Sequence, residues 1–325
     1  MKFSIVLVAL TAGTSIAHPG MSKAMADIQE IQARDGRSGP STEMIGDLVD
    51  LDDRRLTATG RDIKNILSGR GIPQNTVASY WLGAPRLGGL LCRMDQRCVW
   101  KHIANEMRGM MVGDAGRCNN LARTSIRLGF HDAATWSKDT GGTGADGSIV
   151  LTAECARVPE NNGLAEGYGV SMADLIQFAA NVATVSCPLG PRIKTYIGRK
   201  DNAVEPPRNL LPSPFHSADR LLELFADKTF TADGLIALMG AHSRASSVSS
   251  TIPAPAYAAE YVRMSLLGVY NINSLTDCTK ALPPFQRSYS SSDKSVIDRF
   301  MHGLIGSAQK VKNLLLKGDK VPSNV

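Results

Sequence analysis

The sequence predicts a mainly α-helical fold. Apolar residues recur at spacings of three and four in several stretches, which is the pattern of helices with one buried face. No stretch alternates apolar and polar residues over the length of a half-buried strand. With 43% hydrophobic and 20% charged residues in a chain of 325, the composition is that of a soluble globular protein. The chain is long enough for one large domain or for two lobes that share a core.

The N-terminal residues have the pattern of a secretory signal peptide. A lysine precedes the apolar residues 3–10, and small residues suited to cleavage follow at 15–17. We therefore predict that residues 1–17 are a signal peptide and that the protein is secreted to the extracellular space. Residues 18–90 carry scattered charges, glycine, proline and serine. They are either a pro-segment, processed at Arg54 and Arg55, or a weakly structured surface stretch. We expect the compact region to begin between Trp81 and Cys92.

The distribution of charge and hydropathy restricts the partners that we expect for this protein. The formal net charge of +6 is spread along the chain without a dense Lys/Arg run, which disfavours a nucleic-acid partner. No stretch after the signal peptide is long and apolar enough to span a membrane, so we expect no membrane partner. We also expect a monomer.

An even number of cysteines in a secreted chain favours three disulfides, whose pairing stays open. The cysteines are Cys92, Cys98, Cys118, Cys155, Cys187 and Cys278.

Helices are expected in order along the chain. Residues 98–111 and 121–134 have helical periodicity. Ser171 and Asp174 have the spacing of a capping box and open an apolar helix over 175–185, which stops before Pro188. Two further helices cover 217–227 and 231–241, and the second ends at His242. The segment 252–273 stays ambiguous, and residues 291–293 are a candidate cap for a last helix that runs to about residue 316.

Arg127 and His131 are the first candidates for catalysis. They lie four residues apart in the helix 121–134, so their side chains share one face. A neutral imidazole takes up and returns a proton near neutral pH, and a fixed guanidinium stabilises developing negative charge. The pair is therefore either an acid/base group beside an electrostatic stabiliser, or a surface arginine and a core histidine on an ordinary helix.

The glycine-rich stretch 138–148 is a candidate ion-binding loop. Its glycines allow the backbone to wrap a small ion, and Asp132, Asp146 and Ser148 offer the hard oxygen ligands that calcium prefers. The loop lacks the final glutamate that an EF-hand needs. Alone, it is a weak signal.

Six short motifs then occur in the order found in one family. They are RLGFHD (127–132), GADGS (144–148), NNGL (161–164), CP (187–188), GR (198–199) and GAHS (240–243). With these motifs the sequence resembles the secreted fungal haem peroxidases, class II of the plant–fungal–bacterial peroxidase superfamily. The resemblance implies a two-lobed helical fold with haem b between the lobes. The peroxidase domain would cover 91–316, with a distal lobe of about 91–190, a proximal lobe of about 191–316, and a tail at 317–325.

The resemblance also implies roles on the distal side of the haem. His131 matches the distal histidine, which moves a proton between the oxygens of hydrogen peroxide. Arg127 matches the distal arginine, and Phe130 the aromatic that packs over the haem. Asn161 matches the asparagine that holds the imidazole in its working tautomer. Without the resemblance, Phe130 would be interpreted as a core residue and Asn161 as a turn residue.

On the proximal side, His242 matches the axial ligand of the haem iron. Asp293 is our choice for the carboxylate that accepts a hydrogen bond from His242, and it is also a candidate helix cap. Further matches imply one distal calcium site and one disulfide. The calcium ligands would be Asp132, Gly144, Asp146 and Ser148, and the disulfide would join Cys118 to Cys187.

Departures from the family narrow the expected function. Ser243 is present, but the next acidic residue is Glu260, so we expect no proximal calcium site. The three carboxylate positions of manganese-oxidising relatives hold Asn120, Thr124 and Val248, and the surface tryptophan of lignin-oxidising relatives falls near Ala237.

We therefore expect a haem peroxidase that uses hydrogen peroxide to oxidise small phenol-like reductants, and not a manganese or lignin specialist. The alternatives are an enzyme of one specific oxidative coupling, or a non-catalytic, calcium-stabilised binding protein. Trp81, Trp100 and Trp136 are expected to be packing residues.

Overall fold

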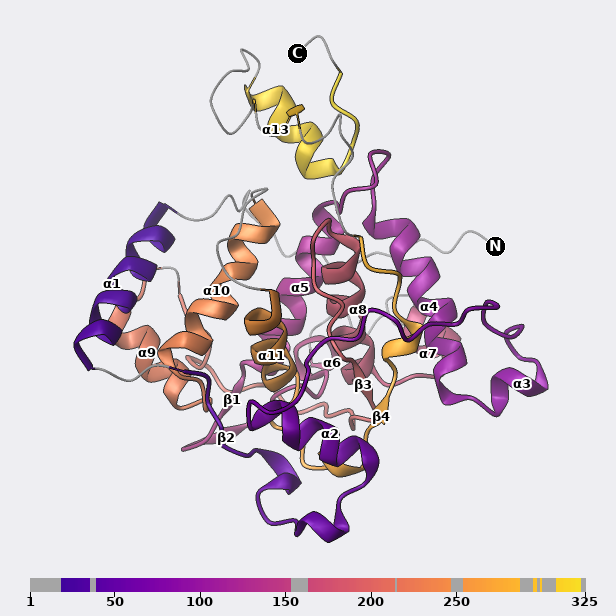
Figure 1. Cartoon of the computed structure of the whole chain (residues 1–325), viewed down its shortest axis with the longest axis horizontal. Helices are drawn as coiled ribbons and strands as arrows, with labels where there is room; N and C mark the ends of the chain where they lie inside the picture. The colour runs from indigo at the N-terminus through magenta and orange to yellow at the C-terminus, as the bar shows by residue number, and fades with distance from the viewer. Residues whose placement is uncertain are drawn as a thin grey trace.

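The computed structural model describes residues 19–35, 39–152, 163–213, 215–246, 254–286, 295–296, 299 and 308–322. Within these residues the fold is mainly α-helical, as predicted (Figure 1). The strands are short and form two antiparallel pairs. One pair joins β1 (Trp136–Ser137) to β2 (Gly141–Gly142), and the other joins β3 (Tyr196–Ile197) to β4 (Thr276–Asp277).

Helix α8 (Met172–Ser186) is the centre of one layer. Every residue of α8 except Ala179 is buried, because α5 (Asn120–Ala133) and α4 (Gln96–Met111) both pack against it (Figure 1). The predicted cap is present: the Ser171 side chain accepts a hydrogen bond from the Asp174 backbone N–H. Asn119 caps α5 and Asp95 caps α4 in the same way. The buried side chains of α4 and α8 form one hydrophobic cluster, which we call the α8 cluster.

A second hydrophobic cluster, the α11 cluster, lies around three helices from later in the chain. Helix α10 (Ala232–Ser246) packs against α11 (Ala254–Met264) and α9 (Ala218–Ala226). Helix α10 continues past His242, where the sequence predicted its end. The predicted last helix is described only in part, chiefly as α13 (Ala308–Lys317). The short helices are α3 (Leu90–Arg93), α6 (Ser148–Leu151) and α7 (Gly163–Tyr168).

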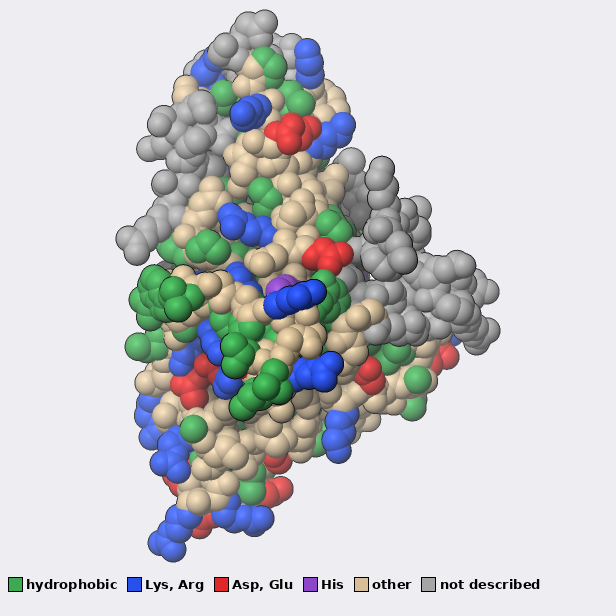
Figure 2. All heavy atoms as spheres, turned by 90° about the vertical axis from the view of Figure 1, so that its right-hand side faces the viewer, with side chains coloured by type: hydrophobic (Ala, Val, Ile, Leu, Met, Phe, Trp, Pro, Cys, Tyr) green, Lys and Arg blue, Asp and Glu red, His purple; other side chains and the backbone are tan. Residues whose placement is uncertain are grey.

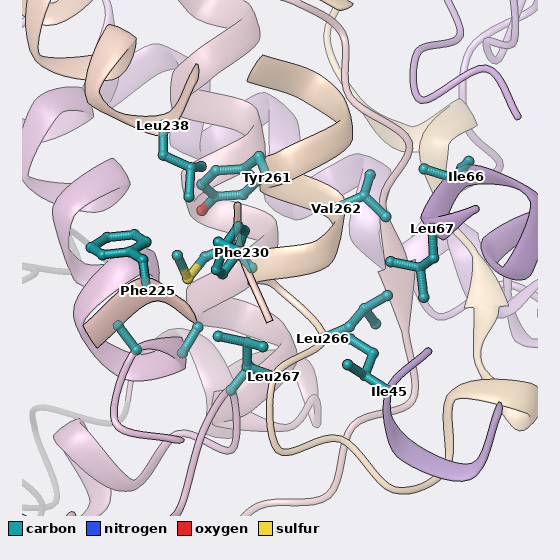
Figure 3. Close-up of a cluster of buried hydrophobic side chains, with 14 of the residues drawn as sticks. Ile45, Ile66, Leu67, Phe225, Phe230, Leu238, Tyr261, Val262, Leu266 and Leu267 are labelled. Atoms are coloured by element: carbon teal, nitrogen blue, oxygen red, sulfur yellow. The ribbon is translucent and has the colours of Figure 1, made fainter. Parts of the chain in front are cut away.

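The N-terminal segment belongs to the α11 cluster. Helix α1 (Pro19–Asp35) packs on α9 and α10 and buries Ile28, and α2 (Ala58–Leu67) packs on α11. Figure 3 shows Ile45 and Leu67 of this segment beside Leu266. The expectation that the compact region begins between Trp81 and Cys92 was therefore wrong. Each apolar run in residues 19–67 is too short to predict burial by itself. These residues are buried because helices from much later in the chain pack on them.

The cysteines only partly follow the prediction. Cys118 pairs with Cys187, the pair that the resemblance implies, and Cys92 pairs with Cys98. Cys278 is a free thiol, fully buried in the α8 cluster, so the default of three disulfides was wrong. A buried free cysteine packs as a small apolar side chain, which explains its place there. Cys155 lies outside the described residues.

The three tryptophans differ in burial. Trp100 is buried and its ring lies 4.8 Å from that of Phe178. Trp136 is half-buried, and its indole N–H donates to the Tyr270 hydroxyl at 3.2 Å. Trp81 is 83% exposed, so its interpretation as a packing residue was wrong. Among the described helices, none combines the length and hydropathy needed to cross a membrane.

Candidate active site and ion site

Helix α5 presents Arg127 and His131 on the face that points away from α8. Its opposite face is buried and includes Gly129, whose carbonyl accepts a hydrogen bond from the Gln177 side chain at 2.9 Å. A Cβ at Gly129 would lie 2.7 Å from the Tyr261 hydroxyl and 2.8 Å from the Ala180 methyl, so the helices approach too closely for any other residue. This packing fixes the rotation of α5. Arg127 is consequently exposed and His131 half-buried on the same side.

Phe130 connects this face to the α11 cluster. Its ring lies 5.7 Å from the His131 ring in an edge-on arrangement and 6.4 Å from the Phe225 ring in a stacked one. Phe130 also packs against the cluster to which Leu238 and Met239 of α10 belong. Phe130 of α5 and two residues of the helix that carries His242 therefore border the same apolar cluster.

The structure brings together only some of the predicted haem-site residues. Arg127, Phe130 and His131 lie on one helix with the geometry given above. The backbone of His242 is part of α10, but its side chain is not among those described. Asn161 and Asp293 lie outside the described residues. The predicted roles of these last three residues stay predictions.

The candidate ion site is assembled by the turn between α5 and α6. Asp132, Asp146 and Ser148 are all buried there. Asp132 Oδ2 accepts a hydrogen bond from the Gly147 N–H at 3.1 Å, and Asp146 Oδ1 accepts one from the Ser148 N–H at 3.0 Å. Gly144 has φ +83°, and a Cβ there would lie 2.4 Å from the Leu267 carbonyl oxygen, so only glycine fits.

Two buried oxygens of this site lack a hydrogen-bond partner within the described part of the chain. They are Asp132 Oδ1 and Ser148 Oγ. The pKa of Asp132 is raised to about 7, mainly by burial and in part by the nearby Asp146 carboxylate, while the hydrogen bond from the Gly147 N–H opposes the increase. Two adjacent buried carboxylates, one with an unsatisfied oxygen, are stabilised by a cation, and a set of ligands made only of oxygen suits calcium. The residues present therefore fit the calcium ion that the resemblance implies.

Two polar residues that the sequence did not single out support the site. The Asn202 side chain donates to Asp146 Oδ2 at 2.9 Å, which fixes one carboxylate from a separate loop. Arg199 forms a buried ion pair with Asp174 at 3.0 Å and donates to the Ser265 carbonyl, joining α8 to the end of α11. Arg199 was visible only as part of the GR motif, and Asn202 follows it closely in the chain.

Comparisons with known proteins agree with this arrangement. The model of the peroxidase family matches residues 104–267, just over half of the chain. A peroxidase from Arthromyces ramosus is 32% identical over 176 residues, which cover 49% of this chain and 48% of the relative. A peroxidase from Coprinopsis cinerea is 30% identical over 198 residues, covering 56% and 54%. A low-redox potential peroxidase from Taiwanofungus camphoratus is 34% identical over 167 residues, covering 47% of each chain.

The chain spans about half the length of these curated relatives. The matched region contains α5, the ion-site turn, α8 and α10, which are the elements on which the site is built. Because the family model matches just over half of the chain and fungal peroxidases are similar to it, the chain belongs to the peroxidase family of the plant–fungal–bacterial superfamily.

Proposed function

We propose that the protein is a secreted haem peroxidase in which hydrogen peroxide drives the one-electron oxidation of small phenol-like reductants. The observation that carries this proposal is the placement of Arg127 and His131 on the face of α5 opposite Gly129, beside Phe130. Membership of the peroxidase family and the similarity to two fungal peroxidases support the reaction class.

The described residues are compatible with haem between α5 and α10. Phe130 and the α10 residues Leu238 and Met239 share one apolar cluster, which suits a flat apolar cofactor. His242 on α10 would be the axial ligand, since imidazole is a common ligand of haem iron. When bound, haem supplies a redox-active iron that exchanges electrons with peroxide and reductant.

His131 and Arg127 would divide the work on peroxide. His131 would accept the proton from one peroxide oxygen and return it to the other, which then leaves as water. Arg127 would stabilise the negative charge that develops on the leaving oxygen as the O–O bond breaks. The packing of Gly129 against α8 and α11 keeps both side chains at fixed positions on the helix.

A calcium ion held by Asp132, Gly144, Asp146 and Ser148 would stabilise this end of α5. Asp132 directly follows His131, so an ion bound at its carboxylate would restrain the backbone that carries the imidazole. The role of the calcium ion would be to hold His131 in position, and not to take part in the reaction. No proximal calcium site is proposed, for the reason given above.

A general reductant is favoured over manganese or a lignin-like polymer. The Asn120 side chain accepts a hydrogen bond from Arg123 at 2.8 Å, and an amide is a poor ligand for a divalent cation compared with a carboxylate. Ala237 is buried, so the position expected for a surface tryptophan does not reach solvent. A panel of phenols would distinguish a general peroxidase, with broad turnover, from an enzyme of one specific coupling.

His131→Ala tests the proposed acid/base role. The variant should retain haem but react with hydrogen peroxide about 10²–10⁴-fold more slowly, because the proton must then move through water. Rapid mixing with peroxide, followed at the haem absorption band, measures this rate. His216→Ala is the matched control, since His216 is also half-buried and accepts a backbone hydrogen bond away from α5. Equal rates for His131→Ala and the control would refute the assignment.

A further inference from the structure

Exposed apolar side chains gather in one stretch of the chain, residues 81–94, which we call the Trp81 loop. It contains six of the thirteen large hydrophobic residues that are exposed in the described structure. These six are Trp81, Leu82, Leu87, Leu90, Leu91 and Met94. Figure 2 shows the face on which this part of the chain lies, where hydrophobic side chains are mixed with Lys and Arg and with some Asp and Glu. Single exposed apolar residues are ordinary, but a run of this kind indicates an interaction surface.

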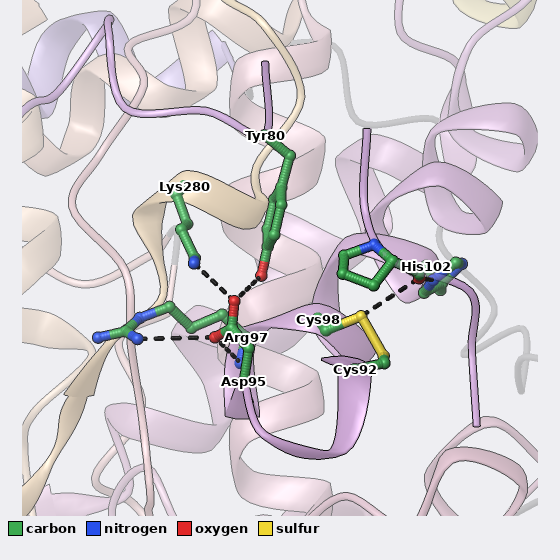
Figure 4. Close-up of a disulfide and its surroundings, with 8 residues drawn as sticks. Tyr80, Cys92, Asp95, Arg97, Cys98, His102 and Lys280 are labelled. Carbon is green, nitrogen blue, oxygen red and sulfur yellow. Dashed lines mark hydrogen bonds and ion pairs between the residues drawn. A yellow bond between two sulfur atoms is a disulfide. The ribbon is translucent and has the colours of Figure 1, made fainter. Parts of the chain in front are cut away.

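The loop is held firmly with these side chains outward. The Tyr80 hydroxyl donates to Asp95 Oδ2 at 2.7 Å, and Lys280 Nζ lies 2.6 Å from the same oxygen (Figure 4). Near the other end, the Cys92–Cys98 disulfide ties the loop to α4. The middle is tied as well, because the His102 ring contacts the Pro85 carbonyl oxygen at 2.9 Å. The loop is therefore pre-organised, and its apolar residues cannot fold inward without breaking these contacts.

The charge of this stretch has one sign. From Ile63 to Met94 the chain contains four basic residues and no acidic one. Two of the four, Arg86 and Arg93, lie within the Trp81 loop and are exposed. Asp95, directly after the loop, already accepts hydrogen bonds from Tyr80 and Lys280, so its negative charge is paired. The loop therefore offers an apolar surface with positive charge to its partner.

We propose that the Trp81 loop docks the protein onto the surface of an anionic phospholipid membrane. Tryptophan favours the membrane interface, leucine and methionine enter the outer acyl region, and arginine contacts phosphate groups. Helix α3, within the loop, lies at the periphery of the molecule, where a lipid surface can reach it (Figure 1). The protein would lie on the membrane without spanning it. This proposal differs from our expectation of no membrane partner, and it is independent of the proposed function.

A second copy of the chain fits the loop less well. In a symmetric dimer through this surface, the loops of both copies would face each other, and Arg86 and Arg93 would meet their own counterparts. Like charges brought together at an interface oppose association. Anionic headgroups have the opposite sign and therefore suit the loop better.

The test is co-sedimentation of the full chain with vesicles, combined with tryptophan fluorescence. Vesicles of equimolar phosphatidylcholine and phosphatidylglycerol should bind the protein and shift the emission of the exposed Trp81 to shorter wavelength. Vesicles of phosphatidylcholine alone should bind it at least about tenfold more weakly, and added salt should weaken binding to the anionic vesicles.

Leu91→Glu should reduce binding to the anionic vesicles at least about tenfold, because it places a carboxylate where the loop meets lipid. Phe215→Glu is the matched control: Phe215 is 80% exposed but lies outside the loop, so this variant should bind like the wild type. Circular dichroism confirms that both variants fold. Absence of binding by the wild type at low salt, or equal binding by Leu91→Glu, would overturn the proposal. Concentration-dependent dimers that Leu91→Glu abolishes, without vesicle binding, would assign the loop to self-association instead.

Discussion

Asp132 shows how a single buried group can report on a ligand. Its carboxylate is inaccessible to solvent, and one of its oxygens has no hydrogen-bond partner in the described structure. Leaving a charged group in that state costs free energy, and a bound cation removes the cost. The stability of the folded protein should therefore depend on calcium, and this dependence should be lost when Asp132 is replaced.

Asp132→Asn tests the calcium site without measuring activity. Chelation of calcium should lower the melting temperature of the wild type, because an ion at a hundred times its dissociation constant stabilises the folded state by about 2.7 kcal/mol. The Asp132→Asn variant should respond much less to chelation. Asp219→Asn, an exposed change in α9, should respond like the wild type. The site is refuted if chelation lowers the melting temperature of Asp132→Asn as much as that of the wild type.

Glu260 should make stability depend on pH. It is buried between α11 and α10, and its Oε2 lies 4.0 Å from the Arg263 Nε, too far for a hydrogen bond. Burial raises the pKa of Glu260 to about 7, with Arg263 opposing the increase and Asp233 adding to it. The folded state keeps its proton where the unfolded state has lost it. The contribution of Glu260 to stability should therefore be complete below pH 4.5 and be lost as the pH rises to about 7.

The size of this effect follows from the pKa difference, and a raised pKa of about 7 corresponds to about 3 kcal/mol. Glu260→Gln removes the titrating group and keeps the shape of the side chain. Denaturant unfolding should give similar stabilities for the two proteins near pH 4.5, and a more stable variant above pH 7. Parallel pH profiles would show that Glu260 does not titrate in this way.

Single residues also show where sequence alone was insufficient. The glycines of the stretch 138–148 predicted a tight loop beside Asp132, and the structure has one there. The role of its oxygens as calcium ligands stays a prediction. The exposure of Trp81 was not predictable, since an aromatic residue is usually buried and only the tertiary structure shows that nothing in the described chain covers it. The free thiol of Cys278 was missed for a related reason: whether two cysteines form a disulfide depends on which segments of the chain meet in space.

At the scale of elements, the contact between α5 and α8 determines the position of the proposed catalytic pair. Gly129→Ala should destabilise the protein by about 1–3 kcal/mol, because the added methyl meets Tyr261 and Ala180 in a packed core. Gly109→Ala is the matched control in α4, where an added methyl meets nothing within 4 Å. That change should stabilise the protein by about 0.5–1 kcal/mol. Denaturant unfolding measures both, and a neutral Gly129→Ala would contradict the packing described.

Helices with local signals were predicted well. Helix α8 has a cap at Ser171 and a stop before Pro188, and its predicted and observed bounds agree closely. Helix α10 extends past its predicted end, because residues 243–246 contain no glycine or proline that would end a helix at His242. Helix α11 was left ambiguous, since its buried side chains include Glu260 and Arg263, which look like surface residues in sequence.

For the whole molecule, the segment before the peroxidase-like region is the main difference from the prediction. Arg263, itself buried, donates hydrogen bonds to the carbonyls of Ser41, Glu43 and Leu67. These contacts join parts of the chain about two hundred residues apart, and no local pattern shows them. Processing at Arg54 and Arg55 stays a prediction. Cleavage there would leave α1 attached to α9 and α10 only by packing and hydrogen bonds.

The visible spectrum of the full chain, reconstituted with haem, tests the central claim most directly. We expect a Soret band for the wild type that shifts when hydrogen peroxide is added, and a weaker or altered band for His242→Ala. A wild-type chain that acquires no Soret band, or one whose band peroxide leaves unchanged, would contradict the proposed haem peroxidase.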